Sequence, residues 1–141
     1  MGQMLTVVDG TDGLGAAARG ATIERMEQGA DVPFCYLTTR GRVTGRPHEI
    51  ELWFARDGDT LYLLSGGGDR ADWVRNLRDQ PAVSVRVGDV TSPAGGRVVE
   101  EGTTEDALAR RLVFEKYQPE YSGDLRGWRD TAVAVAIDVQ S

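Results

Sequence analysis

The stretch that decides the fold is residues 34–64, which read FCYLTTRGRVTGRPHEIELWFARDGDTLYLL. Phe34 to Thr39 and Thr60 to Leu64 are short apolar segments with the composition of strands, and Glu49 to Arg56 alternates apolar and polar residues. Asp57-Gly58-Asp59 predicts a tight hairpin turn, because Asp-Gly supplies the positive φ angles that match strand twist. The stretch therefore predicts three consecutive antiparallel strands.

The rest of the chain adds helices and further strands to this start. Ser65 to Gly68 leads into a predicted helix from Arg70 to Asp79, with Asp69 as its expected N-cap and Pro81 ending it. Hairpins stand where a doubly wound fold would have crossovers, so the order predicts a mainly β fold, an antiparallel barrel with flanking helices in one domain, 1–141. The remaining expected elements are strands at Ala82–Val87, Arg97–Glu101 and Thr131–Val139, and a helix from a cap at Thr103 or Thr104 to Tyr117.

Residues 1–30 are rich in glycine and are expected to form an N-terminal extension with a helix from Leu14 to Gln28. The segment Val7 to Gly15 has the general look of a strand entering a dinucleotide loop. Its Gly-x-x-Gly-x-Gly spacing does not fit the usual fingerprint, so we interpret it as an entry segment.

The composition excludes several classes of protein. The single Cys35 leaves no internal disulfide framework, and the single His48 leaves no multi-histidine metal site, so no metal is expected. A net charge of −6 argues against nucleic-acid binding. No apolar run approaches the roughly 20 residues that span a bilayer, and no secretory signal is apparent, so we expect no stable membrane insertion and a cytoplasmic location.

Positive charge is concentrated in the connection from Arg40 to Pro47, which contains no acidic residue. The rest of the chain then carries 13 basic and 22 acidic residues, so a compact positive spot sits on an acidic protein, a pattern that suits one small anionic group. Arginine meets phosphate or carboxylate with a planar fork of donors, and Gly41 and Gly45 let backbone amides approach the same anion. The alternative is a solvated hairpin whose arginines only maintain solubility.

The glycine-rich loop from Ser65 to Gly68 offers a second anion-binding setting, because it precedes a helix N-terminus. Against this, Asp69 and Asp72 are able to cap the helix themselves, and their charge opposes phosphate. The strand order delivers both loops to the same end of the barrel, so we expect them to meet.

Several motifs together resemble the deazaflavin-dependent nitroreductase family of the split β-barrel flavin-binding superfamily. The resemblance covers about residues 34–100 and implies a split antiparallel β-barrel of the FMN-binding, pyridoxamine-phosphate-oxidase-like type. The motifs are Leu37-Thr38-Thr39-Arg40-Gly41-Arg42-Val43-Thr44-Gly45-Arg46-Pro47, Ser65-Gly66-Gly67-Gly68, Asp72-Trp73-Val74-Arg75-Asn76-Leu77 and Pro81-Ala82-Val83.

This resemblance implies an oxidoreductase in which the reduced 8-hydroxy-5-deazaflavin coenzyme (F-420) delivers hydride to enones, quinones or nitro compounds. FMN is the alternative cofactor, because Val43 stands where many members have lysine and Glu51-Leu52 where they often have Pro-Leu. The residues implied in cofactor binding are Arg42, Thr44 and Arg46 at the phosphate and acidic tail, Glu51, Leu52 and Trp53 against the ring, and Ser65, Gly66, Gly67, Gly68, Trp73 and Asn76 around the pocket.

The cofactor would carry the hydride chemistry, and the protein would supply orientation and a proton. The candidate proton donors are Tyr117, Tyr121 and His48, and the stretch Phe114 to Tyr121 is a candidate lid. Two other functions stay open, a non-catalytic carrier of a flavin or haem-like ligand and a structural domain without cofactor. The expected partner is a small-molecule substrate, and the sequence leaves both a homodimer and a monomer open.

Overall fold

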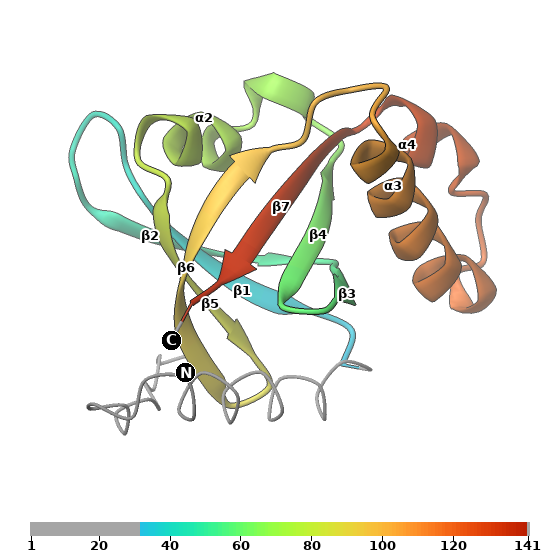
Figure 1. Cartoon of the computed structure of the whole chain (residues 1–141), viewed down its shortest axis with the longest axis horizontal. Helices are drawn as coiled ribbons and strands as arrows, with labels where there is room; N and C mark the ends of the chain where they lie inside the picture. The colour runs from blue at the N-terminus through green and yellow to red at the C-terminus, as the bar shows by residue number, and fades with distance from the viewer. Residues whose placement is uncertain (1–31, 141) are drawn as a thin grey trace.

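The computed structural model describes residues 32–140, so the predictions for residues 1–30 lie outside the described part. The described residues build one seven-stranded sheet (Figure 1). Its strands are β1 (Cys35–Arg40), β2 (Pro47–Leu52), β3 (Ala55–Asp57), β4 (Thr60–Ser65), β5 (Ala82–Val87), β6 (Val90–Val98) and β7 (Val133–Val139).

Helices pack on two sides of this sheet. In Figure 1 the helix α2 lies over one end of the sheet, while α3 and α4 lie together at the far side of β4. The helical segments are the 3-10 helix η2 (Gly68–Arg70), α2 (Asp72–Asp79), α3 (Thr104–Tyr117), the 3-10 helix η3 (Gln118–Glu120) and α4 (Arg126–Thr131).

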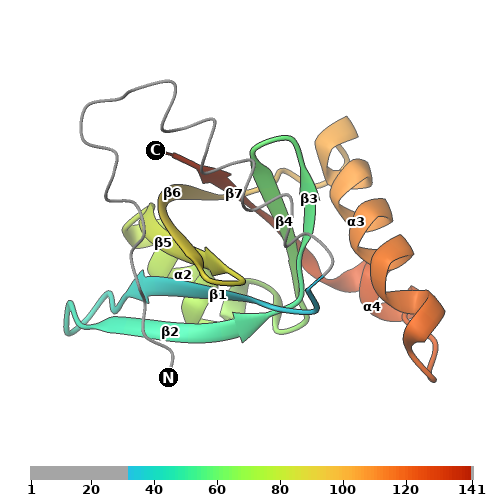
Figure 2. The same cartoon turned by 90° about the horizontal axis from the view of Figure 1, so that it is seen from below.

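The strand order is β2-β1-β5-β6-β7-β4-β3, and every neighbouring pair is antiparallel. The two edge strands, β2 and β3, follow each other directly along the chain, and Figure 2 shows how the sheet curls so that β2 leads into β3. Together with the flanking helices, this curled half-barrel confirms the predicted mainly β split-barrel fold.

The single strand expected over Glu49–Arg56 is wrong, because the chain bends at Trp53 and Phe54 and forms two strands there. The backbone of Phe54 is hydrogen-bonded by side chains of α3 instead of by a neighbouring strand. Its N–H donates to the Tyr117 hydroxyl at 3.0 Å, and its carbonyl accepts from Lys116 Nζ at 2.9 Å. These bonds satisfy the peptide groups that the bend removes from the sheet.

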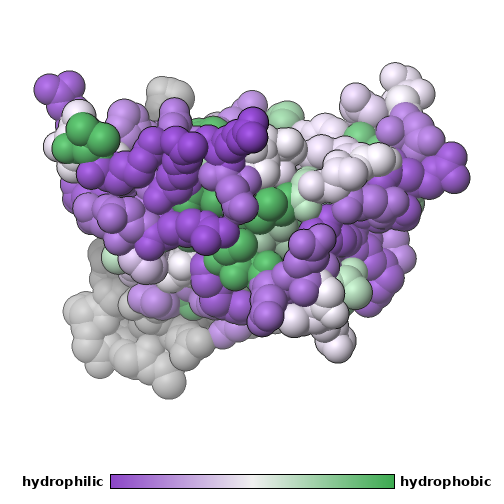
Figure 3. All heavy atoms as spheres, turned by 90° about the horizontal axis from the view of Figure 1, so that it is seen from above, coloured by the Kyte–Doolittle hydropathy of each residue, from purple (hydrophilic) through white to green (hydrophobic). Residues whose placement is uncertain are grey.

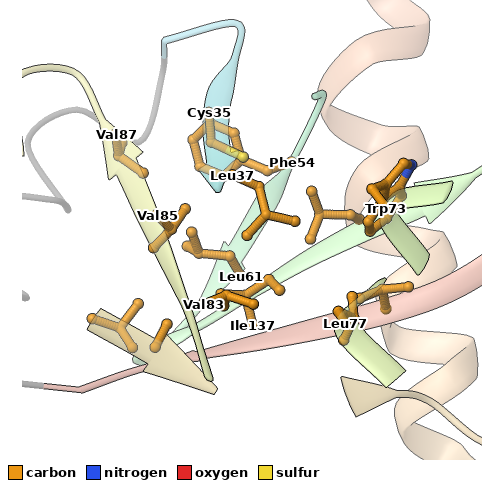
Figure 4. Packing of buried hydrophobic residues seen from close by; sticks show 14 of the residues in the cluster. Cys35, Leu37, Phe54, Leu61, Trp73, Leu77, Val83, Val85, Val87 and Ile137 are labelled. Atoms are coloured by element: carbon orange, nitrogen blue, oxygen red, sulfur yellow. The ribbon is translucent and has the colours of Figure 1, made fainter. Parts of the chain in front are cut away.

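The core has two parts because β4 is buried on both faces. Inside the curled sheet, Leu37, Phe54 and Ile137 pack with Trp73 and Leu77 of α2 (Figure 4). On the outer side, α3 and α4 cover a second cluster; its buried members are Ala55, Tyr62, Leu64, Val99, Ala109, Val113, Tyr117, Leu125, Ala132, Ala134 and Ala136. The sheet is therefore held from both sides.

The start of α2 differs from the prediction. The helix begins at Asp72, its N-cap is Ala71 without a side-chain bond, and η2 occupies the residues before it. Asp69 is therefore not the N-cap, and its carboxylate pairs with Arg78 at 2.9 Å. The predicted cap of the second long helix is confirmed, because the Thr103 hydroxyl accepts from the N–H of Asp106 at 3.1 Å.

Two elements at the C-terminal half also differ. The fifth strand of the prediction, Arg97–Glu101, is wrong in its bounds, because β6 starts at Val90 and ends at Val98. Pro93 fits in β6 because the pairing of β6 with β7 begins one residue later, at Ala94. The helix α4 is an element that the sequence analysis did not predict, and it moves the start of the last strand from Thr131 to Val133.

Candidate functional site

The hairpin between β1 and β2 is held in one conformation by its own hydrogen bonds. The N–H of Gly41 donates to the carbonyl of Arg46 at 2.8 Å, and the N–H of Gly45 donates to the carbonyl of Gly41 at 2.8 Å. Gly45 has φ +76°, a backbone conformation that residues other than glycine rarely adopt. Arg40 is used inside the loop, since its Nη1 donates to the carbonyl of Gly45 at 2.9 Å.

Arg42 leaves this loop toward α2, where Asn76 binds it twice. The Asn76 Oδ1 atom accepts from the backbone N–H of Arg42 at 3.1 Å and from its Nη1 at 2.7 Å. Asn76 is buried, and its Nδ2 donates to the hydroxyl of Thr39 at 3.4 Å, which orients the amide. A neutral, fixed amide thus positions the guanidinium without cancelling its charge.

A pocket of about 420 Å³ lies between this hairpin and α2. In Figure 1 the hairpin extends from the sheet beside α2, and Figure 3 shows the face that carries α2 as mainly hydrophilic. The pocket has a polar end at Arg42 and Thr44 and an apolar side at Ile50 and Trp73. Its lining residues are Thr39, Gly41, Arg42, Val43, Thr44, His48, Glu49, Ile50, Asp72, Trp73 and Asn76.

Two carboxylates stand in the same lining. Asp72 Oδ1 lies 3.2 Å from Arg42 Nη2, and the Asp72 side chain is 82% exposed. Glu49 Oε2 lies 3.9 Å from Arg86 Nη2 on β5. Ion pairs of such exposed groups contribute little, typically about 0–1 kcal/mol, so a ligand anion is able to replace Asp72 at Arg42.

Of the residues predicted around the cofactor or as donors, five line this pocket: Arg42, Thr44, His48, Trp73 and Asn76. Arg46 is exposed on the same hairpin, where its N–H donates to the Thr44 hydroxyl at 3.2 Å. Thr39, Glu49 and Ile50 also line the pocket and were not among the predicted site residues. The pairings of Thr39 with His48 and of Leu37 with Ile50 put Thr39, His48 and Ile50 on one face of the hairpin. Glu49 pairs with Thr38 on the other face, so this signal does not find it.

No residue of the glycine-rich loop, 65–68, is among those that line the described pocket. β1 and β4 run in the same direction through the sheet, so the loop after β4 does emerge at the end where the hairpin lies. A Cβ on Gly66 would lie 3.2 Å from Nε1 of Trp128, which places Gly66 beside α4, whereas a Cβ on Gly67 would lie 3.5 Å from the Cβ of Ala71, just before α2. The printed contacts of Arg42 go to α2, and the direct meeting of the two loops stays a prediction.

The residues predicted against the cofactor ring lie at the end of β2 and at the bend that follows it, each in a different environment. The Trp53 ring stacks on Tyr117 with centroids 4.3 Å apart, and it meets Tyr121 and Trp128 edge-on. Leu52 packs against the inner core, and Glu51 accepts a hydrogen bond from the Tyr36 hydroxyl at 2.7 Å. None of these residues is among those that line the described pocket.

The hydroxyl of Tyr117 is hydrogen-bonded to backbone groups. It donates to the carbonyl of Pro33 at 2.7 Å and accepts from the N–H of Phe54. Burial raises the pKa of Tyr117 to about 12, so it is a poorer acid than a free tyrosine. Tyr121, by contrast, is exposed.

The curled antiparallel half-barrel has the fold of the split-barrel class of proteins. Within this class the match is to one family. Residues 15–140 fit the model of the F420H(2)-dependent quinone reductases, and the chain belongs to this family.

Individual proteins agree with this assignment. The chain is 31% identical over 93 residues to the F420H(2)-dependent quinone reductase Rv1261c of Mycobacterium tuberculosis, a match that spans 64% of this chain and 62% of that protein. A solved structure of an F420-H2 dependent reductase, FDR-A, shares the fold with a TM-score of 0.61 at 24% identity, over 77% of this chain and 95% of that one. A structure described as a domain-swapped dimer has a TM-score of 0.61 at 25% identity, over 86% and 95%.

The family match confirms the predicted resemblance to a deazaflavin-dependent family of the split-barrel fold. In residues 32–140 no helix has both the length and the apolar character that crossing a membrane requires.

Proposed function

We propose that this chain is a reductase that uses the reduced deazaflavin coenzyme F-420 to reduce quinones, with enones and nitro compounds as further candidate acceptors, and that Arg42 binds the coenzyme's phosphate. The observation that carries the proposal is the way Arg42 is held. Its partner Asn76 is buried and neutral, so the guanidinium is positioned and its charge is available to a ligand. Family membership supports the identity of the coenzyme.

The lining residues fit a molecule with a charged end and a flat apolar part. Arg42 offers guanidinium donors to a phosphate oxygen, and the Thr44 hydroxyl lies in the same lining. Ile50 and Trp73 provide apolar surface, and pockets that bind cofactors usually combine such surface with a few polar groups. The phosphate end is therefore proposed at Arg42 and Thr44, with the ring system toward Ile50 and Trp73.

When bound, the reduced coenzyme supplies the hydride. The chain has to hold it in one orientation and provide a proton for the reduced acceptor. Among the three candidate donors, His48 lines the pocket, whereas the Tyr117 hydroxyl is bonded to backbone at the bend between β2 and β3. These contacts favour His48 as the proton donor and Tyr117 as a structural residue.

Oxidation of the reduced coenzyme by a soluble quinone tests this function, and Arg42→Ala tests the site. Loss of one charge-assisted contact costs roughly 1.5–3 kcal/mol, so we expect coenzyme affinity to fall about 10- to 150-fold. Arg75→Ala is the matched control, because it removes an exposed arginine of α2 that is not in the pocket lining. A protein that binds the coenzyme but shows no turnover with any acceptor would instead be a carrier.

The proposal of a homodimer rests on the edge strand β2. This strand pairs with β1 on one side, and its other side ends the sheet, which leaves backbone groups able to pair with a second copy. A structural relative described as a domain-swapped dimer supports the idea. Light scattering after size-exclusion chromatography measures the mass; a monomer at all concentrations would exclude the homodimer.

A further inference from the structure

Arg42 has two partners of opposite character. On one side the amide oxygen of Asn76 is buried and lies 2.7 Å from Nη1. On the other side the Asp72 carboxylate is exposed and lies 3.2 Å from Nη2. Asn76 fixes the position of the guanidinium. Replacing the exposed Asp72 by a ligand anion costs little free energy, because exposed ion pairs are weak.

We propose that Asp72 determines which kind of phosphate the pocket accepts, favouring a singly charged phosphodiester over a doubly charged phosphomonoester. This inference rests on the proposed function and goes further, because it selects between the two cofactor classes that the sequence left open. The phosphate that joins a deazaflavin to its acidic tail is a diester, whereas that of FMN is a monoester.

The charges at the pocket carry the argument. Arg42 contributes one positive charge, and Asp72 contributes one negative charge at the same guanidinium. Glu49 adds a second carboxylate to the lining, although Arg86 lies 3.9 Å from it. A ligand phosphate that replaces Asp72 at Arg42 stays near the Asp72 carboxylate. Arg42 is the one arginine among the lining residues, because Arg40 is bonded within the hairpin and Arg46 is not in the lining, so the lining supplies no second guanidinium to a second phosphate charge.

The size of the effect follows from Coulomb's law. Two like charges about 4 Å apart in water repel by an amount equivalent to roughly a fivefold change in affinity. A diester carries one such charge, and a monoester carries about 1.5 to 2 at neutral pH. Asp72 should therefore disfavour a monoester more strongly, by roughly a further two- to fivefold.

Asp72→Asn tests this proposal with little change in shape. The dissociation constants of the deazaflavin coenzyme and of FMN are measured by titration, FMN also as a competitor of the coenzyme. We expect Asp72→Asn to tighten coenzyme binding about fivefold and FMN binding about 10- to 25-fold, so that the preference for the coenzyme shrinks. The difference should diminish as salt is raised, because the charges are exposed.

Asp79→Asn is the matched control. Asp79 ends the same helix, is exposed and is not in the pocket lining, so its removal changes the net charge equally. It should leave the ratio of the two affinities unchanged. A general charge effect would move both variants alike and would overturn the proposal.

The two failures are distinguishable. If the wild type and Asp72→Asn bind the coenzyme but the ratio of FMN to coenzyme affinity stays the same, the role of Asp72 is refuted and the proposed function stands. The role of Asp72 is also refuted, and the proposed function also stands, if FMN competes with the coenzyme neither in the wild type nor in Asp72→Asn. If the wild type and both variants bind no coenzyme, the proposed function fails and this inference fails with it.

Discussion

Replacing Asn76 by aspartate changes the charge beside Arg42 and little else. The substituted oxygen would take the position of Oδ1, which accepts from the Arg42 backbone N–H at 3.1 Å and from Nη1 at 2.7 Å. The lost Nδ2 atom donates only a long 3.4 Å bond to Thr39. A buried carboxylate here forms a permanent ion pair with Arg42, so the guanidinium no longer has a free charge to offer to a phosphate.

The magnitude follows from these contacts. Loss of a charge-assisted bond to phosphate is worth roughly 1.5–3 kcal/mol, which corresponds to about 10- to 150-fold weaker coenzyme binding. Stability should change by no more than about 1 kcal/mol, because the attraction to Arg42 offsets the cost of burying the carboxylate. Asn76→Ala has the reverse profile: it leaves two Arg42 donors without their acceptor and should destabilise the fold by about 1–3 kcal/mol.

The assay is a coenzyme titration beside urea unfolding for both variants. We expect Asn76→Asp to bind the coenzyme more weakly than Asn76→Ala, although it is the more stable of the two. Stability and affinity would then rank the variants in opposite orders. If Asn76→Asp binds the coenzyme as tightly as the wild type, the charge of Arg42 is not what holds the phosphate, and the reasoning for the site is wrong.

Three further predictions concern the fold. Gly96→Ala should lower the free energy of unfolding by about 1–3 kcal/mol in urea, since its Cβ would lie 2.6 Å from Leu77 Cδ1; a neutral substitution would show that α2 moves away freely. Tyr117→Phe should cost about 1–3 kcal/mol because a backbone N–H at the bend between β2 and β3 loses its acceptor, and coenzyme affinity should not change; weaker binding would place the bend in the site. Hydrogen bonds from Arg97 hold the pKa of Glu105 to about 2, below its ordinary value near 4.5, so its stabilisation is complete above pH 4.5 and is lost toward pH 2. Urea unfolding at several pH values should therefore show that the free energy of unfolding falls less between pH 4.5 and pH 2 in Arg97→Met than in the wild type. Equal falls in the two proteins would contradict this prediction.

The fold was predictable because its main signals are local. Apolar and alternating segments identify β1, β4 and β5, and the predicted turn at Asp57-Gly58 joins β3 to β4, where Asp57 pairs with Thr60. Thr103 marks the start of α3 through a side-chain bond three residues away. Each of these signals acts within a few residues, so the sequence alone displays it.

The errors occur where partners distant in the sequence decide the local structure. The bend after β2 depends on Tyr117 and Lys116, more than 60 residues away, which bind the backbone of Phe54. In β6, Gly96 looks like a strand breaker, yet it lies under Leu77 of α2, where a side chain would not fit. Alternation has no means of showing either contact, because both depend on how helices pack against the sheet.

The candidate site divides in the same way. The arginines, the glycines and Thr44 of the hairpin are visible in one short stretch, and that stretch does form the polar end of the pocket. The property that turns Arg42 from a surface charge into an anion receptor comes from Asn76, 34 residues later. The helix α2, which follows the glycine-rich loop, packs against β1, and both its first residue, Asp72, and Asn76 one turn later bind Arg42 of the hairpin. A motif that spans both the hairpin and α2 therefore carries more functional information than either part, because its two halves are the two walls of one pocket.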